Sequence, residues 1–107
     1  MNIINRGYLL IMYRQEFLSW ANQFNEIEYK EGELEPAVYL IEEEFMEEDK
    51  VIEGLFKKIM QVEFVSVTED EEQWPEISRA KFDELFTCIT GSTVIDTVKN
   101  AVQREEI

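Results

Sequence analysis

The sequence predicts a single α+β domain over residues 1–107, in which a three-stranded sheet carries helices on one face in two layers. The predicted order is strand, helix, strand, helix, helix, strand. Three apolar or β-branched runs have the length of buried strands, and the segments between them place apolar residues at helical spacing. A chain of 107 residues, 45% of them hydrophobic, supports one core of packed layers.

The first two predicted strands are the apolar runs GYLLIMYR, residues 7–14, and AVYLI, residues 37–41. The first ends at a charge and the second is rich in β-branched and aromatic residues, which favour a pleated and buried strand. If these strands are parallel neighbours, the crossover that joins them is expected to be right-handed.

A helix is predicted between these strands, in the segment QEFLSWANQF at residues 15–24. Its apolar residues recur at i, i+3, i+4 and i+7, so they share one face and Trp20 is expected in the core. A charged loop, marked by Gly32 and closed by Pro36, follows. The apolar face consists of Phe17, Trp20, Ala21 and Phe24.

The strongest helical pattern runs from Asp49 to about Phe64. Gly54 within it costs on the order of 1 kcal/mol relative to alanine, and the apolar contacts of the helix outweigh that cost. The alternative is a strand at VEFVSV, residues 62–67, and we favour the helix. The pattern rests on Val51, Ile52, Leu55, Phe56, Ile59 and Met60.

The last third of the chain predicts a loop, a helix, a strand and a short final helix. TEDEEQWP is a loop, and SRAKFDELF is a helix with Ser78 as its N-cap. The β-branched run TCITGSTVID, residues 87–96, is the third strand, in which Gly91 marks a bulge. TVKNAVQREEI, residues 97–107, is predicted to close the chain as a short helix.

The net charge of −14 is concentrated in two acidic blocks. Residues 26–49 hold eleven acids and one lysine, and residues 69–84 hold seven acids and two bases. This strong negative charge repels nucleic-acid phosphates and anionic membranes. We therefore expect neither nucleic acid nor a membrane as a partner. The charge either keeps the chain soluble or attracts a cation or a basic protein.

Two clusters are the candidate partner-binding residues. Acids at a helix N-terminus are also favoured by the helix dipole, which explains part of the first cluster without a ligand. The second cluster ends in Trp74-Pro75, where Trp74 either anchors a partner or folds back on the core. The candidates are Glu42, Glu43, Glu44, Glu47, Glu48 and Asp49 in the first block, and Asp70, Glu71, Glu72 and Trp74 in the second.

Most catalytic chemistries lack their residues in this chain. There is no histidine, so Ser–His and Cys–His catalysis and imidazole metal sites are excluded. Cys88 is the only cysteine and is expected to be a small core residue of a cytosolic protein. No glycine-rich phosphate loop occurs, and no apolar run is long enough to span a membrane. We therefore expect no enzyme, no catalytic residue and no cofactor.

The predicted function is that of a non-enzymatic, acidic module that binds a basic protein, in the manner of immunity proteins or nucleic-acid mimics. The alternative is a protein that binds Ca²⁺ or Mg²⁺ through carboxylate oxygens. EEEFMEED, residues 42–49, lacks the glycine and the alternating acids of an ordered calcium loop, so we assign no metal ligands. A small enzyme that uses carboxylates alone is a third possibility.

Six segments occur in this order over nearly the whole chain: FLSW, EPAVYLIEE, FKKIMQVEF, DEEQWP, FDELF and STVID. Together they resemble an uncharacterised family of small, acidic bacterial proteins. The resemblance implies one domain with the strand and helix order given above, and it carries no known activity. A histidine that is common before the last strand of the family is replaced here by Gly91.

Overall fold

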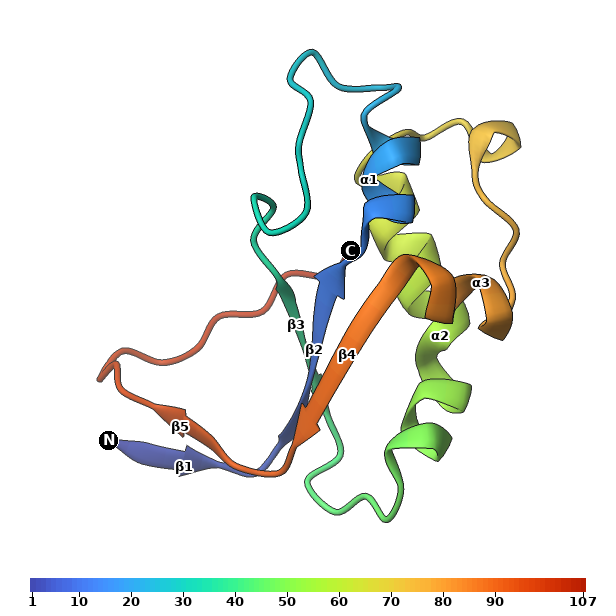
Figure 1. Ribbon diagram of the computed structural model, residues 1–107. Coiled ribbons are helices and arrows are strands. Elements are labelled where there is room, and N and C mark those ends of the chain that lie inside the picture. The colour runs from blue at the N-terminus through green and yellow to red at the C-terminus, as the bar shows by residue number, and fades with distance from the viewer.

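The computed structural model describes all 107 residues as an α+β domain with five strands and three α-helices (Figure 1). Strands β3, β2 and β4 form an antiparallel sheet with β2 in the centre, and β1 pairs with β5 in a separate two-stranded ribbon. The elements are β1 (Asn2–Ile4), β2 (Gly7–Tyr13), α1 (Gln15–Ala21), β3 (Ala37–Ile41), α2 (Glu48–Val65), a 3₁₀ turn (Glu71–Gln73), α3 (Arg79–Leu85), β4 (Phe86–Gly91) and β5 (Val94–Asp96).

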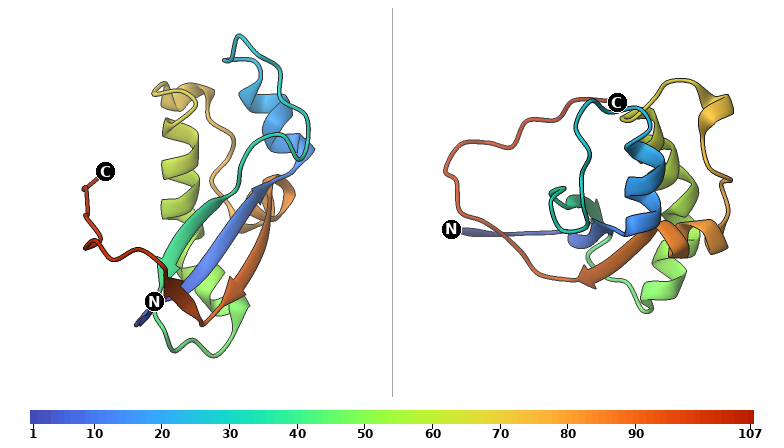
Figure 2. Two further views of the ribbon diagram at one scale, coloured as in Figure 1. Left: turned by 90° about the vertical axis from the view of Figure 1, so that its left-hand side faces the viewer. Right: turned by 45° about the horizontal axis from the view of Figure 1, so that its top comes forward.

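The two faces of the three-stranded sheet have opposite environments because side chains alternate along each strand. Leu9 and Ile11 of β2 are fully buried, whereas Leu10 between them points to the other face and remains partly exposed. Figures 1 and 2 show α1, α2 and α3 on one side of the sheet and no helix on the other. Leu9 and Ile11 share one core cluster with buried residues of these three helices. The core therefore lies between the inner face of the sheet and the three helices.

The central predictions about the elements are confirmed. The strands at residues 7–14 and 37–41 and the three helices that follow or separate them form within a few residues of the predicted bounds. Ser78 caps α3, and its hydroxyl accepts a hydrogen bond from the backbone N–H of Lys81. The alternative strand at residues 62–67 is wrong, because α2 continues to Val65 and buries Glu63 and Phe64 against the core.

The predicted order of elements is incomplete because it lacks β1 and divides the last strand differently. The run at residues 87–96 breaks after Gly91, and only its second part pairs with β1. Tyr8 pairs with Gly91 and Ile4 pairs with Val94, so the segment from Ile4 to Tyr8 is one residue longer than the segment it faces. The extra residue therefore lies between Ile4 and Tyr8, opposite the predicted bulge at Gly91. A Cβ atom on Gly91 would lie 2.4 Å from the ring of Tyr8, which explains the glycine.

Two further expectations differ from the structure. β2 and β3 are neighbours but antiparallel, so the right-handed crossover of a parallel pair does not arise. The final helix is wrong, because residues 97–107 are irregular and exposed. Val98 and Val102 have no core to pack against, and a helix of this length is marginal in water without tertiary contacts.

Candidate functional site

The acids that follow β3 lie in an exposed loop and in the first turn of α2. Glu42, Glu43 and Glu44 occupy the loop, and Glu47 is the N-cap residue of α2, although its side chain makes no capping hydrogen bond. Glu48 and Asp49 lie in the first turn, near the positive end of the helix dipole.

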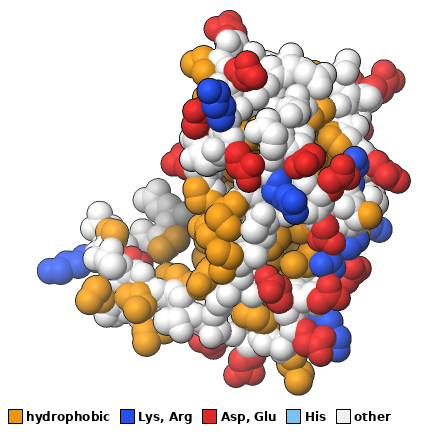
Figure 3. All heavy atoms as spheres, viewed as in Figure 1, with side chains coloured by type: hydrophobic (Ala, Val, Ile, Leu, Met, Phe, Trp, Pro, Cys, Tyr) orange, Lys and Arg blue, Asp and Glu red, His pale blue; other side chains and the backbone are white.

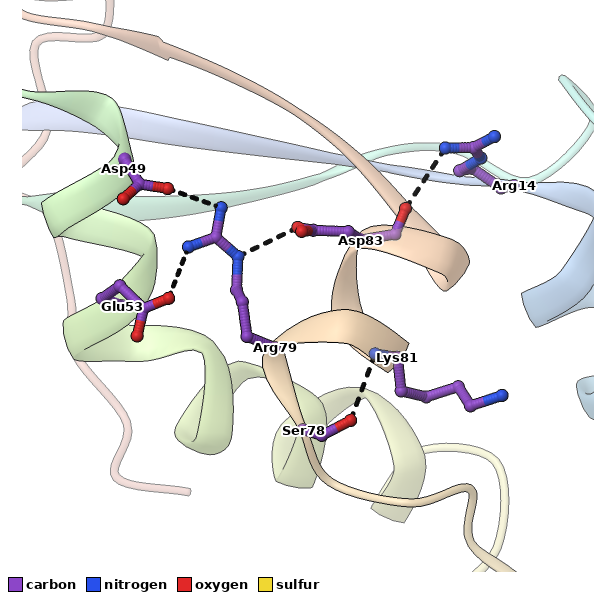
Figure 4. Close-up of polar contacts among 7 residues, drawn as sticks. All are labelled: Arg14, Asp49, Glu53, Ser78, Arg79, Lys81 and Asp83. Carbon is purple, nitrogen blue, oxygen red and sulfur yellow. Dashed lines mark hydrogen bonds and ion pairs between the residues drawn. The ribbon is translucent and has the colours of Figure 1, made fainter.

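Asp49 has a structural partner. Its Oδ1 atom lies 2.9 Å from Nη2 of Arg79, whose guanidinium also contacts Glu53 at 2.8 Å and Asp83 at 3.0 Å (Figure 4). The hydrogen bond from Arg79 to Asp83, together with those to Glu53 and Asp49, raises the pKa of Arg79 above its usual value. Asp49 therefore helps to join α2 to α3, and it differs in this respect from the other acids of its cluster.

Three of the predicted residues border a groove of about 700 Å³, which we call the acidic groove. Glu42, Glu44 and Glu47 line it, together with the apolar side chains of β3, the loop and α2. Met46 also lines the groove and is 96% exposed, so an apolar side chain is exposed to water beside three carboxylates. The remaining lining residues are Arg6, Leu40, Ile41, Phe45, Lys50, Val51, Gly54 and Leu55.

The acidic groove combines charge with apolar surface. Neither Arg6 nor Lys50 forms an ion pair within the structure, and the same is true of the three carboxylates. Gly54 lies on the groove side of α2, where a Cβ atom would meet no atom within 4 Å. The groove therefore has open space and unpaired charge next to apolar side chains.

Glu43 and Glu48 are exposed but do not line the acidic groove. Nowhere in the chain do three acidic or cysteine side chains converge closely enough to hold a metal ion. A calcium or magnesium site needs several oxygen ligands around one point. The geometry therefore gives no support to the divalent-cation alternative.

The second cluster lies at the other end of α2. Asp70 caps the 3₁₀ turn by accepting a hydrogen bond from the backbone N–H of Glu72, and Glu71 and Glu72 are exposed in that turn. α2 has 18 residues and is therefore about 27 Å long, and the two clusters lie at its opposite ends. The structure does not bring the two clusters together into one site.

Trp74 folds back toward the core. Its indole Nε1–H donates to the carbonyl oxygen of Thr68 at 2.8 Å, and its ring lies 5.9 Å from that of Phe64. Trp20, expected in the core, is partly buried and donates to the carbonyl oxygen of Gln73 at 2.8 Å. The two indoles hold the segment from Thr68 to Trp74 against α1 and α2.

Sequence reasoning missed one carboxylate, that of Glu63 in α2. Glu63 is buried, and its two oxygens accept hydrogen bonds from the hydroxyl groups of Tyr13 (2.5 Å) and Tyr39. Burial, followed by the hydrogen bond and charge of Glu63, raises the pKa of both tyrosines well above 10.0. These side chains come from β2, β3 and α2, so the cluster joins the helix to two strands.

A signal for this cluster was present in the sequence. Glu63 follows Phe56, Ile59 and Met60 at helical spacing, so it falls on the apolar face of α2. A carboxylate at such a position needs buried hydrogen-bond donors, and the tyrosines of the two predicted strands are the available ones.

Cys88 is partly buried in β4. Burial, with the negative charges of Glu48 and Asp83, raises the pKa of its thiol to about 11. The thiol is therefore protonated near neutral pH and is a poor nucleophile there.

Comparison with known proteins adds no further constraint. No helix of the structure is both long enough and apolar enough to cross a membrane. No protein-family model, no curated protein and no solved structure matches the chain.

Proposed function

We propose that this protein is a non-enzymatic, cytosolic binding module whose acidic groove receives a basic segment of another protein. The observation that carries the proposal is that Glu42, Glu44 and Glu47 border a groove with apolar walls. The cytosolic part of the proposal rests on the single, unpaired cysteine. We also propose that the chain belongs to the family it resembles, and this membership suggests no activity.

The partner segment should carry both lysine or arginine and at least one large apolar side chain. Carboxylates on the rim attract the basic groups and speed association, whereas desolvated apolar contacts supply most of the affinity. An amphipathic helix in a groove meets both conditions. One class of partner with such charge is a nuclease, whose basic surface binds nucleic acid. This chain would then act as an immunity protein or a nucleic-acid mimic.

A titration followed by NMR tests this chemistry. The ¹⁵N-labelled protein is mixed with a helical peptide of leucine and lysine, and separately with a peptide of equal charge in which serine replaces leucine. We expect the amide shifts of the groove residues to move with the first peptide only, and less at about 0.5 M than at about 0.1 M salt. Equal shifts with both peptides, spread over both acidic blocks, would reject a specific groove.

Gly54→Phe is the blocking variant, because the space above Gly54 is open in the folded chain. Gln61→Phe adds the same side chain at an exposed position of α2 that does not line the groove. We expect Gly54→Phe to lose the peptide response and Gln61→Phe to retain it. If both variants respond like the wild-type protein, the groove is not the binding site.

A further inference from the structure

The outer face of the three-stranded sheet is an apolar surface that no element of the chain covers. Val38, Leu10 and Ile89 form a row across β3, β2 and β4, since Leu10 pairs with both of the others. Val38 is 59% exposed and Ile89 is 46% exposed. Tyr8, Met12 and Leu40 lie on the same face by strand alternation.

The β1–β5 ribbon, which we call the arm, extends this apolar surface away from the domain. In Figure 1 the arm leaves the lower end of the sheet at an angle, and Figure 3 shows hydrophobic side chains over β2, β3 and the arm. Ile3 and Ile95 pair across the arm and are both more than half exposed. The principal contacts of β1 and β5 are with each other.

An isolated two-stranded ribbon is marginally stable in water, and exposed apolar patches of this kind mark interaction sites. The arm therefore gains stability from a surface that packs on it. The outer face of the sheet is such a surface, but the arm stands at an angle to the face of its own chain (Figures 1 and 2).

The charge of this region indicates what covers it. Almost all side chains of the outer face and the arm are uncharged. Arg6 and Asp96 are the only charged residues within Asn2–Tyr13 and Thr87–Asp96. In a chain of net charge −14, this is the region where two copies can meet without opposing carboxylates at the centre of the contact. Glu35 and Glu42 flank β3 at its two ends, at the edge of the face.

We propose that two copies of this chain form a homodimer through the outer face and the arm. A twofold axis places the arm of each copy against the outer face of the other, so one symmetric interface buries both apolar surfaces at once. The acidic groove opens elsewhere, although Leu40 borders both surfaces and Arg6, between β1 and β2, also lines the groove. The dimer therefore leaves the rim carboxylates free for a basic partner.

Sedimentation equilibrium of the full chain tests the proposal. We expect a mass twice the 12.7 kDa of one chain at about 100 μM protein, with an association that strengthens or holds between about 0.1 M and 0.5 M salt, because salt screens the repulsion between two acidic chains. Binding of a basic partner should weaken over the same range, so the two proposals can fail independently.

Val38→Glu and Ile89→Glu place a carboxylate in the central row, and Val38→Thr removes apolar contact without adding charge. Val65→Glu is the matched control, since Val65 is 47% exposed on α2, which lies on the other side of the sheet from the outer face (Figures 1 and 2). We expect dimer association to weaken at least tenfold in Val38→Glu and in Ile89→Glu, to weaken less in Val38→Thr, and to stay unchanged in Val65→Glu. The circular dichroism spectrum should be unchanged in all four variants. A wild-type monomer at 12.7 kDa, a dimer that survives both glutamate variants, or equal loss in Val65→Glu would overturn the proposal.

Discussion

The carboxylates of this chain occupy two contrasting settings. Glu63 lies inside the domain and accepts hydrogen bonds from Tyr13 and Tyr39. Glu42, Glu44 and Glu47 are exposed beside the acidic groove and have no partner in the chain. Of these four residues, only Glu63 lies outside the two acidic blocks.

The difference shows that acid density in the sequence and structural importance are separate properties. A buried carboxylate loses its hydration, so its fixed donors decide whether the fold is stable. An exposed carboxylate keeps its hydration and contributes little to stability when it is unpaired. The folding role of Glu63 and the proposed binding role of the rim acids can therefore be tested by separate substitutions.

The largest effect is expected for Glu63→Ala. It leaves the hydroxyl groups of Tyr13 and Tyr39 without their acceptor and opens space in the core, so the free energy of unfolding should fall by about 3 kcal/mol. Denaturant unfolding measures this change. Glu63→Gln keeps one acceptor oxygen and should cost less; equal stability of Glu63→Ala and the wild-type protein would mean that the cluster does not support the fold.

The same cluster predicts a loss of stability at alkaline pH. The pKa values of Tyr13 and Tyr39 are raised above 10.0, chiefly by burial and then by Glu63. Above about pH 10 the unfolded chain releases phenolic protons that the folded chain retains, so the free energy of unfolding falls as the pH rises, and the contribution is complete below that pH. Denaturant midpoints from about pH 8 to about pH 11 should show the decline.

Phenolate absorbance supplies the control for this prediction. At about pH 11 the folded chain should show fewer ionised tyrosines than the four it contains, and the unfolded chain should show nearly all of them. Full ionisation in the folded state would contradict the buried hydrogen bonds.

A smaller effect is expected for Arg79→Met, which removes the ion pairs with Asp49, Glu53 and Asp83 but keeps much of the apolar stem. The three carboxylates are more than half exposed, so their pairs are partly screened and the loss should be about 1 kcal/mol. High salt should reduce the difference between the two proteins. Lys81→Met, which removes one exposed pair with Glu84, is the matched control and should cost less.

The smallest effect on stability is expected when Glu42, Glu44 and Glu47 are all changed to glutamine. The free energy of unfolding should stay within about 0.5 kcal/mol of the wild-type value, because these side chains have no internal partner. Thermal or denaturant unfolding measures it. A loss of more than about 2 kcal/mol would show that the rim acids belong to the fold.

Much of the fold follows from local patterns, and the site follows from them only in part. The apolar alternation of GYLLIMY and the helical spacing after Asp49 fix β2 and α2, since each pattern suits one structure. β1 was missed because Asn2–Ile4 is too short to show a period, and its pairing with β5 depends on contacts far along the chain. The final helix failed because residues 97–107 have no surface to pack on.

The candidate site residues, like the fold, were predictable only where a local sequence pattern indicated them. The sequence located the acids near the start of α2, but local spacing could not show that Asp49 pairs with Arg79, a residue 30 positions further along. Nor could it show that Trp74 turns inward to Thr68 and Phe64. The groove itself needs β3 and α2 side by side, so it appears only in three dimensions.

The most direct test of the proposed binding role is capture from a lysate of the source organism with three baits. One bait is the wild-type protein, one carries Glu42, Glu44 and Glu47→Gln, and one carries Glu26, Glu28 and Glu31→Gln, an equal change of charge in the exposed loop before β3. We predict that a basic protein is captured at about 0.1 M salt by the wild-type and loop baits and lost from the groove bait. Equal capture by all three, or none by the wild-type protein, would contradict the account.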